Sequence, residues 1–347
     1  GALRSQLLAS HGVDVGQFAS NKTVLSGALA RSLGTPEQPG DFRISHFLLG
    51  RWEASTTTLT DVFWPLPADI VVTTDANGAK QAHALRPHRV PATIQTSAPC
   101  EQIPVLCTEK QVKPEGGLWL NSASMQAWLN DQPIDASHLV ETHSLWKVDS
   151  RLGIALDTQA RTTGNGQLYT VDAVALARHV GFLAGVSGSD RLLPENGVLR
   201  LGGDGRAAQH STIEWQPPCP NWQQIAANKR FKLLLTTPGL FEQGWLLPGM
   251  SVHDGDYLWK TPDFSARLVT AAITRAEMIS GWDVAVNQPK PALKAVSIGS
   301  VYWFDRLEGN VGALEKLAEQ SLFGLDQYPD AKRRAEGFNN ILIGSWS

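Results

Sequence analysis

The apolar positions in the first part of the chain predict one helix followed by short strands. The opening residues recur near the i, i+4 spacing of a helix face, and Gly12 follows as a stop signal. β-Branched and aromatic runs at 42–49 and 70–74 predict strands, and the turn sequence 75–78 predicts another strand after it. The predicted helix face consists of Ala2, Leu3, Leu7 and Leu8.

Between these runs and the middle of the chain the pattern is less regular. The proline-punctuated residues 87–114 predict a surface loop. A short helix is predicted next, with Ser122 or Ser124 as its N-cap. Its apolar face, at i, i+3 and i+4, consists of Met125, Trp128 and Leu129.

The second half of the chain alternates strands with at least one helix. Two apolar runs at 168–176 and 179–186, separated by a short link, predict a β-hairpin. A helical apolar face over 314–322 is closed by Gly324. Further strands are predicted at 231–236, 267–274, 296–304 and 337–344.

A proline cluster at 217–220 interrupts this pattern. With 347 residues the chain is too long for one small core, so two domains are expected. The cluster is the best boundary, and it predicts domains at 1–220 and 221–347.

The stretch 281–304 combines an irregular segment with a buried strand. Pro289 and Pro291 fix φ and exclude a helix on either side of Lys290. Gly299 interrupts the apolar run that follows, which indicates a bulge or a close backbone approach there.

Composition narrows the function classes. The formal net charge of −3 argues against binding nucleic acid through overall charge, so any RNA contact must come from a local patch. No apolar run approaches the roughly 18–20 residues that cross a bilayer. The odd number of cysteines, without a C-x-x-C pair, predicts a reducing cytoplasm with no disulfide framework and no zinc site. They are Cys100, Cys107 and Cys219.

Residues 199–208 form the sharpest local motif. Gly203-x-Gly205-x-x-Ala208 superficially matches a dinucleotide fingerprint, but the following residues alternate like a strand instead of opening a helix. Two interpretations stay open. Glycines without Cβ let backbone N–H groups approach phosphate while Arg206 supplies charge, or the glycines form a tight turn with Arg206 merely exposed.

No catalytic set is evident in the sequence. The nine histidines are scattered without metal spacing, and His210, just past the glycines, has no obvious second group near it. The twelve tryptophans suit a sugar-binding face, stacking on splayed bases, or simply cores and interfaces. Those within apolar segments favour the core interpretation, namely Trp215, Trp282 and Trp303.

Several ordered motifs resemble the Cmr family, the repeat-associated mysterious proteins (RAMPs) of type III-B CRISPR effector complexes, and its third subunit in particular. Gly281-Trp282-Asp283, then Pro289-Lys290-Pro291, then 299–304 resemble a C-terminal signature of that family. Other segments that resemble family motifs are 1–4, 64–69, 153–157, 166–169, 199–208 and 337–344.

The resemblance implies an α+β fold of two ferredoxin-like (RRM-like) β-α-β-β-α-β units with a large irregular insertion. In such proteins a Gly-Ala-Leu-Arg run begins the first helix just after the first strand. If Gly1 to Arg4 correspond to it, the first strand is missing from this numbering, and we expect the natural protein to supply it.

The same resemblance implies a non-catalytic, cytoplasmic subunit that holds the 5′ tag of a CRISPR RNA (crRNA). Its expected partners are this tag, the large polymerase-like subunit and a backbone RAMP subunit, with no cofactor, metal, membrane or small-molecule substrate. Two alternatives remain: an RNA-processing endoribonuclease that uses His210, and a carbohydrate-binding β protein. The predicted RNA-binding residues are Arg4, Arg151, Arg161, Gly202, Gly203, Gly205, Arg206 and Lys290.

Overall fold

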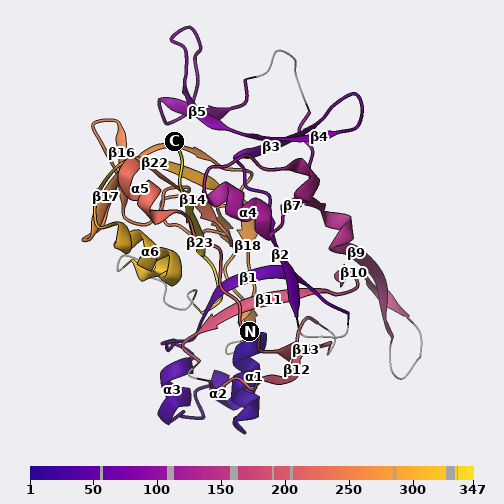
Figure 1. Ribbon diagram of the computed structural model, residues 1–347. Coiled ribbons are helices and arrows are strands. Elements are labelled where there is room, and N and C mark those ends of the chain that lie inside the picture. The colour runs from indigo at the N-terminus through magenta and orange to yellow at the C-terminus, as the bar shows by residue number, and fades with distance from the viewer. Residues whose placement is uncertain are drawn as a thin grey trace.

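The computed structural model is an α+β protein, and every strand pairing among the residues it describes is antiparallel (Figure 1). No helix in the described ranges is long and apolar enough to cross a membrane. The described residues are 1–54, 58–107, 113–156, 163–189, 191–203, 206–283, 287–325, 333 and 335–347.

Three short helices gather at one end of the molecule and enclose a small core (Figure 1). The first confirms the predicted N-terminal helix and buries Leu7 and Leu8 against Phe18. The second begins at an N-cap, Asp14, whose side chain accepts a hydrogen bond from the backbone N–H of Gln17 at 2.7 Å. The helices are α1 (Ala2–Ser10), α2 (Val15–Ala19) and α3 (Gly27–Leu33).

A five-stranded sheet follows, in the order β11-β1-β2-β7-β8. α4 (Ser122–Leu129) packs against it and buries Trp128. The prediction that Ser122 or Ser124 caps this helix is wrong. The N-cap is Asn121, whose side-chain oxygen accepts a hydrogen bond from the backbone N–H of Ser124 at 2.9 Å. Asn121 directly precedes the helix, so its side chain reaches the free N–H groups of the first turn. The strands are β1 (Arg43–Trp52), β2 (Leu59–Pro65), β7 (Leu118–Leu120), β8 (Leu139–Glu141) and β11 (Val180–Ser187), with 3₁₀ turns η1 (Ala136–His138) and η2 (Thr142–Ser144) around β8.

The predicted hairpin of 168–176 with 179–186 is wrong. β10 (Thr163–Leu176) pairs with β9 (Trp146–Leu156), whereas β11 pairs with β1 from far along the chain. Pairing with β1 places Leu183 in the core, a long-range gain that local alternation does not reveal.

Three more hairpins lie outside the main sheets. One confirms the strand expected after the turn at 75–78. The predicted surface loop at 87–114 is partly wrong, because it contains strand pairing between Arg86 and Val105. The hairpins are β3 (Ile70–Thr74) with β4 (Lys80–Ala84), β5 (Arg86–Arg89) with β6 (Gln102–Val105), and β12 (Asn196–Arg200) with β13 (Ala207–Ser211).

The second half of the chain forms a six-stranded sheet in the order β15-β16-β17-β22-β14-β23. The strands expected near 231–236, 267–274, 296–304 and 337–344 are all present. The strands of this sheet are β14 (Phe231–Leu235), β15 (Met250–His253), β16 (Asp256–Lys260), β17 (Phe264–Ala272), β22 (Val301–Gly309) and β23 (Ile341–Gly344). The helices of this half are α5 (Trp222–Asn228), α6 (Val311–Gln320) and the 3₁₀ turn η3 (Leu322–Gly324).

Between β17 and β22 the chain leaves the sheet as two small hairpins. They are β18 (Glu277–Ile279) with β21 (Leu293–Ala295), and β19 (Trp282–Asp283) with β20 (Gln288–Pro289). The return to the sheet confirms the prediction for Gly299, whose φ is +86°. A Cβ there would lie 3.0 Å from the Leu66 carbonyl oxygen.

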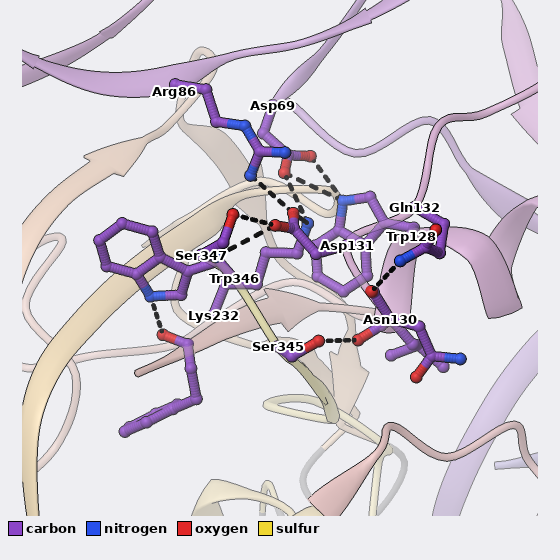
Figure 2. A network of polar contacts seen from close by, with 12 residues as sticks. Asp69, Arg86, Trp128, Asn130, Asp131, Gln132, Lys232, Ser345, Trp346 and Ser347 are labelled. Carbon is purple, nitrogen blue, oxygen red and sulfur yellow. Dashed lines mark hydrogen bonds and ion pairs between the residues drawn. The ribbon is translucent and has the colours of Figure 1, made fainter. Parts of the chain in front are cut away.

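A core cluster and a polar network join the two halves of the chain. Trp64 and Trp128 pack in the same cluster as Trp303. Figure 2 shows the network, in which Lys232 of β14 lies within salt-bridge distance of Asp69 and Asp131. Residues 1–220 and 221–347 therefore share buried apolar and ionic contacts.

Candidate nucleic-acid interface

The glycine motif forms the end of the β12–β13 hairpin. The backbone N–H of Arg206 donates to the Gly203 carbonyl at 3.3 Å, and the N–H of Leu201 donates to the Arg206 carbonyl at 3.1 Å. Gly202 has a φ of +94°, which disfavours any residue with a Cβ. Among the described residues other than the chain neighbours, no atom lies within 4 Å of where a Cβ would sit at Gly202 or Gly203, so these two glycines leave room for an approaching ligand.

The motif has two further predicted RNA-binding residues, Gly205 and Arg206. Gly205 lies outside the described residues. The Arg206 side chain is half-buried at the start of the return strand. The glycines are followed by a strand, β13, and not by the helix that a dinucleotide-binding motif needs, which confirms the prediction made from the sequence.

α1, the helix that carries Arg4, lies beside β12 of the β12–β13 hairpin (Figure 1). Nη2 of Arg4 donates to the Leu33 carbonyl at 3.4 Å. Burial lowers the pKa of the Arg4 guanidinium, and the nearby carboxylate of Glu336 opposes this shift. Arg4 is thus hydrogen-bonded to α3 and lies within electrostatic influence of Glu336.

Lys290 reaches the same carboxylate from the irregular segment. Its Nζ hydrogen-bonds to Oε1 of Glu336, while Nη1 of Arg333 lies 2.8 Å from Oε2. The Lys290 backbone is held by its N–H donating to the Gly281 carbonyl at 2.7 Å. We call Arg4, Lys290, Arg333 and Glu336 the basic cluster.

Trp282 is an exposed aromatic beside this cluster. It pairs across β19–β20 with Pro289, the residue before Lys290, and 56% of its surface is exposed. The core interpretation of Trp282 is therefore wrong, whereas Trp303 is fully buried and Trp215 is half-buried against Trp64. The flanking glycine and prolines were the signal that Trp282 lies outside the core.

Of the two predicted arginines of the middle region, the described one, Arg151, does not join the cluster. Arg151 lies on the β9–β10 hairpin, which projects from the body (Figure 1), and its Nη2 is 2.6 Å from Asp149 Oδ2. Arg161 lies outside the described residues.

The histidine singled out for catalysis has no chemical partner in the described part of the chain. His210 faces Gly197 across the β12–β13 pair, and its Nε2 is buried without a hydrogen bond. No group of three or more His, Cys, Asp or Glu able to hold a metal ion occurs among the described residues. This geometry offers neither a general acid–base pair nor a metal-activated nucleophile there.

Comparisons with known proteins cover nearly the whole chain. The family model described as CRISPR-associated protein (Cas_Cmr3) matches residues 1–346. The cryo-EM structure of the Type III-B Cmr-beta bound to cognate target RNA contains a chain with 13% identity and a TM-score of 0.44, over 86% of this chain and 74% of that one. The cryo-EM structure of the Type III-B Cmr-beta bound to cognate target RNA and AMPPnP, state 1, contains a chain with 12% identity and a TM-score of 0.46. That match covers 99% of this chain and 91% of that one. No curated protein sequence matches.

Proposed function

This chain belongs to the Cas_Cmr3 family of CRISPR-associated proteins, and from that premise we propose that it is a non-catalytic subunit of a type III-B RNA-guided effector complex. In this role it binds the 5′ tag of the crRNA. It also links the large polymerase-like subunit to the backbone RAMP subunits. The complex works in the cytoplasm in antiviral defence.

One observation carries the RNA-binding part of the proposal: Lys290 contacts the Glu336 carboxylate, and Arg4, far away in the sequence, lies near enough to feel its charge. Arg333, whose side chain is only 7% exposed, contacts the same carboxylate, so Glu336 pairs directly with two cations and acts electrostatically on a third, Arg4. A cluster of this kind supplies a local phosphate site on a chain whose net charge is −3.

The neighbouring elements add the other contacts that single-stranded RNA needs. The open turn at Gly202 and Gly203 lets backbone groups approach a phosphate, and Arg206 closes that turn. The exposed ring of Trp282 offers a platform on which a base stacks. The mechanism is positional, because these contacts hold the sugar-phosphate path of the tag in register for target pairing.

We propose a fold correspondence for the second half as well. Within the larger sheet the order β23-β14-β22-β17, with α6 between β22 and β23, matches one ferredoxin-like unit. In chain order, the hairpin β15–β16 comes between β14 and β17, where a ferredoxin-like unit has its first helix. Residues 221–347 form this unit, and residues 1–220 form the other domain with its insertion.

The two alternatives have weaker support. An endoribonuclease needs a second group near His210, which contacts Gly197 instead. A sugar-binding face needs exposed aromatic rings in a row, whereas Trp64, Trp128, Trp259 and Trp303 are fully buried.

The test is RNA binding by the purified protein together with the large subunit. A labelled RNA with the repeat-derived 5′ tag is compared with a scrambled RNA across a salt series. We expect preferential binding of the tag, weakened about 5- to 10-fold by Arg206→Ala or Lys290→Ala. Each lost phosphate contact should reduce the salt slope by about 0.7.

Matched controls are Arg178→Ala and Lys316→Ala, both at exposed positions outside the interface. They should leave affinity for the tag unchanged. Equal binding of tag and scrambled RNA, or no binding by the wild type, refutes the anchoring role.

A further inference from the structure

Three exposed cations meet where β14 begins and β22 ends. The two strands pair, and the backbone N–H of Leu307 in β22 donates to the Lys229 carbonyl at 3.1 Å. This pairing brings Lys229 and Arg230, which precede β14, next to Arg306 of β22, and all three residues are exposed. We call Lys229, Arg230 and Arg306 the β14–β22 patch.

The patch has a local excess of positive charge. Within the described ranges none of its three cations forms a salt bridge. Residues 215–241 contain no Asp or Glu. Of the acids of β22, Asp305 is held by Arg267, whose Nε and Nη2 lie 2.9 and 2.7 Å from its two oxygens, and Glu308 accepts a hydrogen bond from Ser265 Oγ. A local field of this kind attracts anions to a chain whose net charge is −3.

Two of the three cations have a backbone conformation that side chains rarely adopt. The φ angle is +55° at Lys229, the C-cap of α5, and +51° at Arg306. Glycine is usual in this left-handed region, because a Cβ costs free energy there. Arg306 also lies where the register of β17 and β22 shifts, and such a bulge redirects a side chain. Strained backbone at two neighbouring cations indicates a role for these side chains beyond folding.

Arg230 is held in a fixed orientation. Its guanidinium lies over the Trp346 ring, 4.8 Å from the centroid. The ring cannot turn, because its Nε1 donates to the carbonyls of Phe231 and Phe304 at 3.0 and 2.9 Å. A stacked guanidinium loses little freedom when it binds a ligand, and its planar fork matches two oxygens of a phosphate.

The surroundings of the patch favour nucleic acid over a protein partner. Protein interfaces have a core of apolar and aromatic side chains. The exposed large apolar side chains of the described chain lie elsewhere, and none belongs to 215–235, 301–309 or 335–347. An RNA backbone needs only cations and uncharged donors, and the exposed amides of Gln223 and Asn228 add such donors on α5.

The patch lies apart from the basic cluster. Glu336 of the cluster precedes β23, whereas Trp346, on which Arg230 stacks, follows this strand. Four residues of strand span about 13 Å at roughly 3.3 Å per residue. Figure 1 shows α5 and the C-terminus at one end of the molecule and α1, which carries Arg4, at the other.

We propose that the β14–β22 patch is a second phosphate site, which binds the RNA backbone without reading its sequence. The inference rests on the proposed function, since RNA is the ligand in both. Phosphate contacts fix the position of a strand but carry no sequence information. An RNA held at the basic cluster and at the patch is fixed at two points, beyond opposite ends of β23.

The experiment measures binding of two labelled RNAs to the full chain together with the large subunit. One RNA carries the 5′ tag followed by a guide, and the other carries the same guide after a scrambled tag. Arg230→Ala combined with Arg306→Ala should weaken binding of both RNAs by the same factor, about 10-fold, and lower the salt slope by about 1.4, at about 0.7 for each lost contact.

Two further double variants serve as controls. Lys147→Ala with Arg178→Ala removes the same charge at exposed positions outside the patch and should leave both affinities unchanged. Arg230→Lys with Arg306→Lys keeps the charge and should keep the salt slope, which separates lost charge from a folding defect.

The outcomes separate this inference from the proposed function. If the wild type binds neither RNA, both fail. If it prefers the tag and the double alanine variant of the patch matches it in affinity and salt slope, only the patch is refuted, and weaker binding of the large subunit in that case assigns the patch to a protein surface. A variant that loses affinity for the tag RNA alone also overturns the proposal, because the patch then reads sequence.

Discussion

Nζ of Lys232 lies 3.4 Å from Oδ2 of Asp69, inside the protein, where both side chains are almost completely buried. Asp131 adds a second carboxylate at 3.7 Å, and the Trp128 ring lies 4.0 Å from the same nitrogen (Figure 2). Burial lowers the pKa of the Lys232 ammonium group, and the two carboxylates oppose this shift. Because Asp69 and Asp131 belong to the first half of the chain and Lys232 to the second, this ion cluster joins the halves.

We predict that Lys232→Met destabilises the protein by about 3–5 kcal/mol, because it leaves the buried carboxylate of Asp69 without its cation, whereas Asp131 keeps its pairing with Arg86. Chemical denaturation measures the loss, with the exposed Lys316→Met as control. Adding Asp69→Asn to Lys232→Met should restore part of the stability, since it removes one uncompensated charge. A loss below about 1 kcal/mol would contradict the assigned role of the cluster.

His46 should make stability depend on pH. Burial lowers its pKa from 6.5 to about 4. Above pH 6.5 the imidazole is neutral in both states, whereas between pH 6.5 and 4 the unfolded state binds the proton first, so stability falls as the pH falls. At about 1.4 kcal/mol per pKa unit, the full loss is about 3 kcal/mol.

The measurement for His46 is the free energy of unfolding at pH 7.5 and pH 4.5, for wild type and His46→Gln. Wild type should lose more stability than the variant over this interval. The exposed His253→Gln serves as control and should follow wild type. Parallel curves for wild type and His46→Gln would show that His46 does not titrate as its burial implies.

Gly299 and Gly78 form a matched pair for testing a close backbone approach. Their φ angles are +86° and +83°, but only Gly299 has an atom near the position of a Cβ, the Leu66 carbonyl oxygen. Gly299→Ala should therefore cost about 1–3 kcal/mol more than Gly78→Ala, because a clash adds to the shared strain. Thermal and urea unfolding of both variants give the difference, and equal losses would contradict the steric argument.

Trp282→Ala should weaken binding of the tag RNA without destabilising the protein. Loss of one stacked base costs about 1–3 kcal/mol, or roughly 5- to 150-fold in affinity. The control is Met278→Ala, an exposed apolar neighbour in the same segment that cannot stack in this way. Unchanged affinity for Trp282→Ala would remove the aromatic platform from the proposed interface.

Local patterns predicted many elements correctly where one stretch of sequence contains the whole signal. The first helix needs only its own apolar spacing, and the strand 70–74 with its turn needs only neighbouring residues. The close backbone approach at Gly299 was also predicted locally, from a glycine that interrupts an apolar run, although the group that approaches it, Leu66, is far away in the sequence.

The candidate site was only partly accessible from the sequence. The glycine turn and its open backbone follow from the residues of 199–208. The proximity of Arg4 and Lys290 to Glu336 could not be predicted from the sequence, because contacts between distant segments leave no periodic signal. For the same reason Trp282 looked like a core residue, although the segment that carries it leaves the sheet.

The sequence by itself determined the α+β class, most strand positions, the exclusion of the dinucleotide fold and the family resemblance that the match over residues 1–346 confirms. Only the tertiary structure decided which strands pair, which charges meet and which apolar faces stay open. The alternation of β10 and β11 is compatible with several partners, and the choice of β9 and β1 depends on burial gained across the whole chain. The periodicity of the sequence specifies on which face of a strand or helix a side chain lies, whereas long-range packing specifies which other element contacts that face.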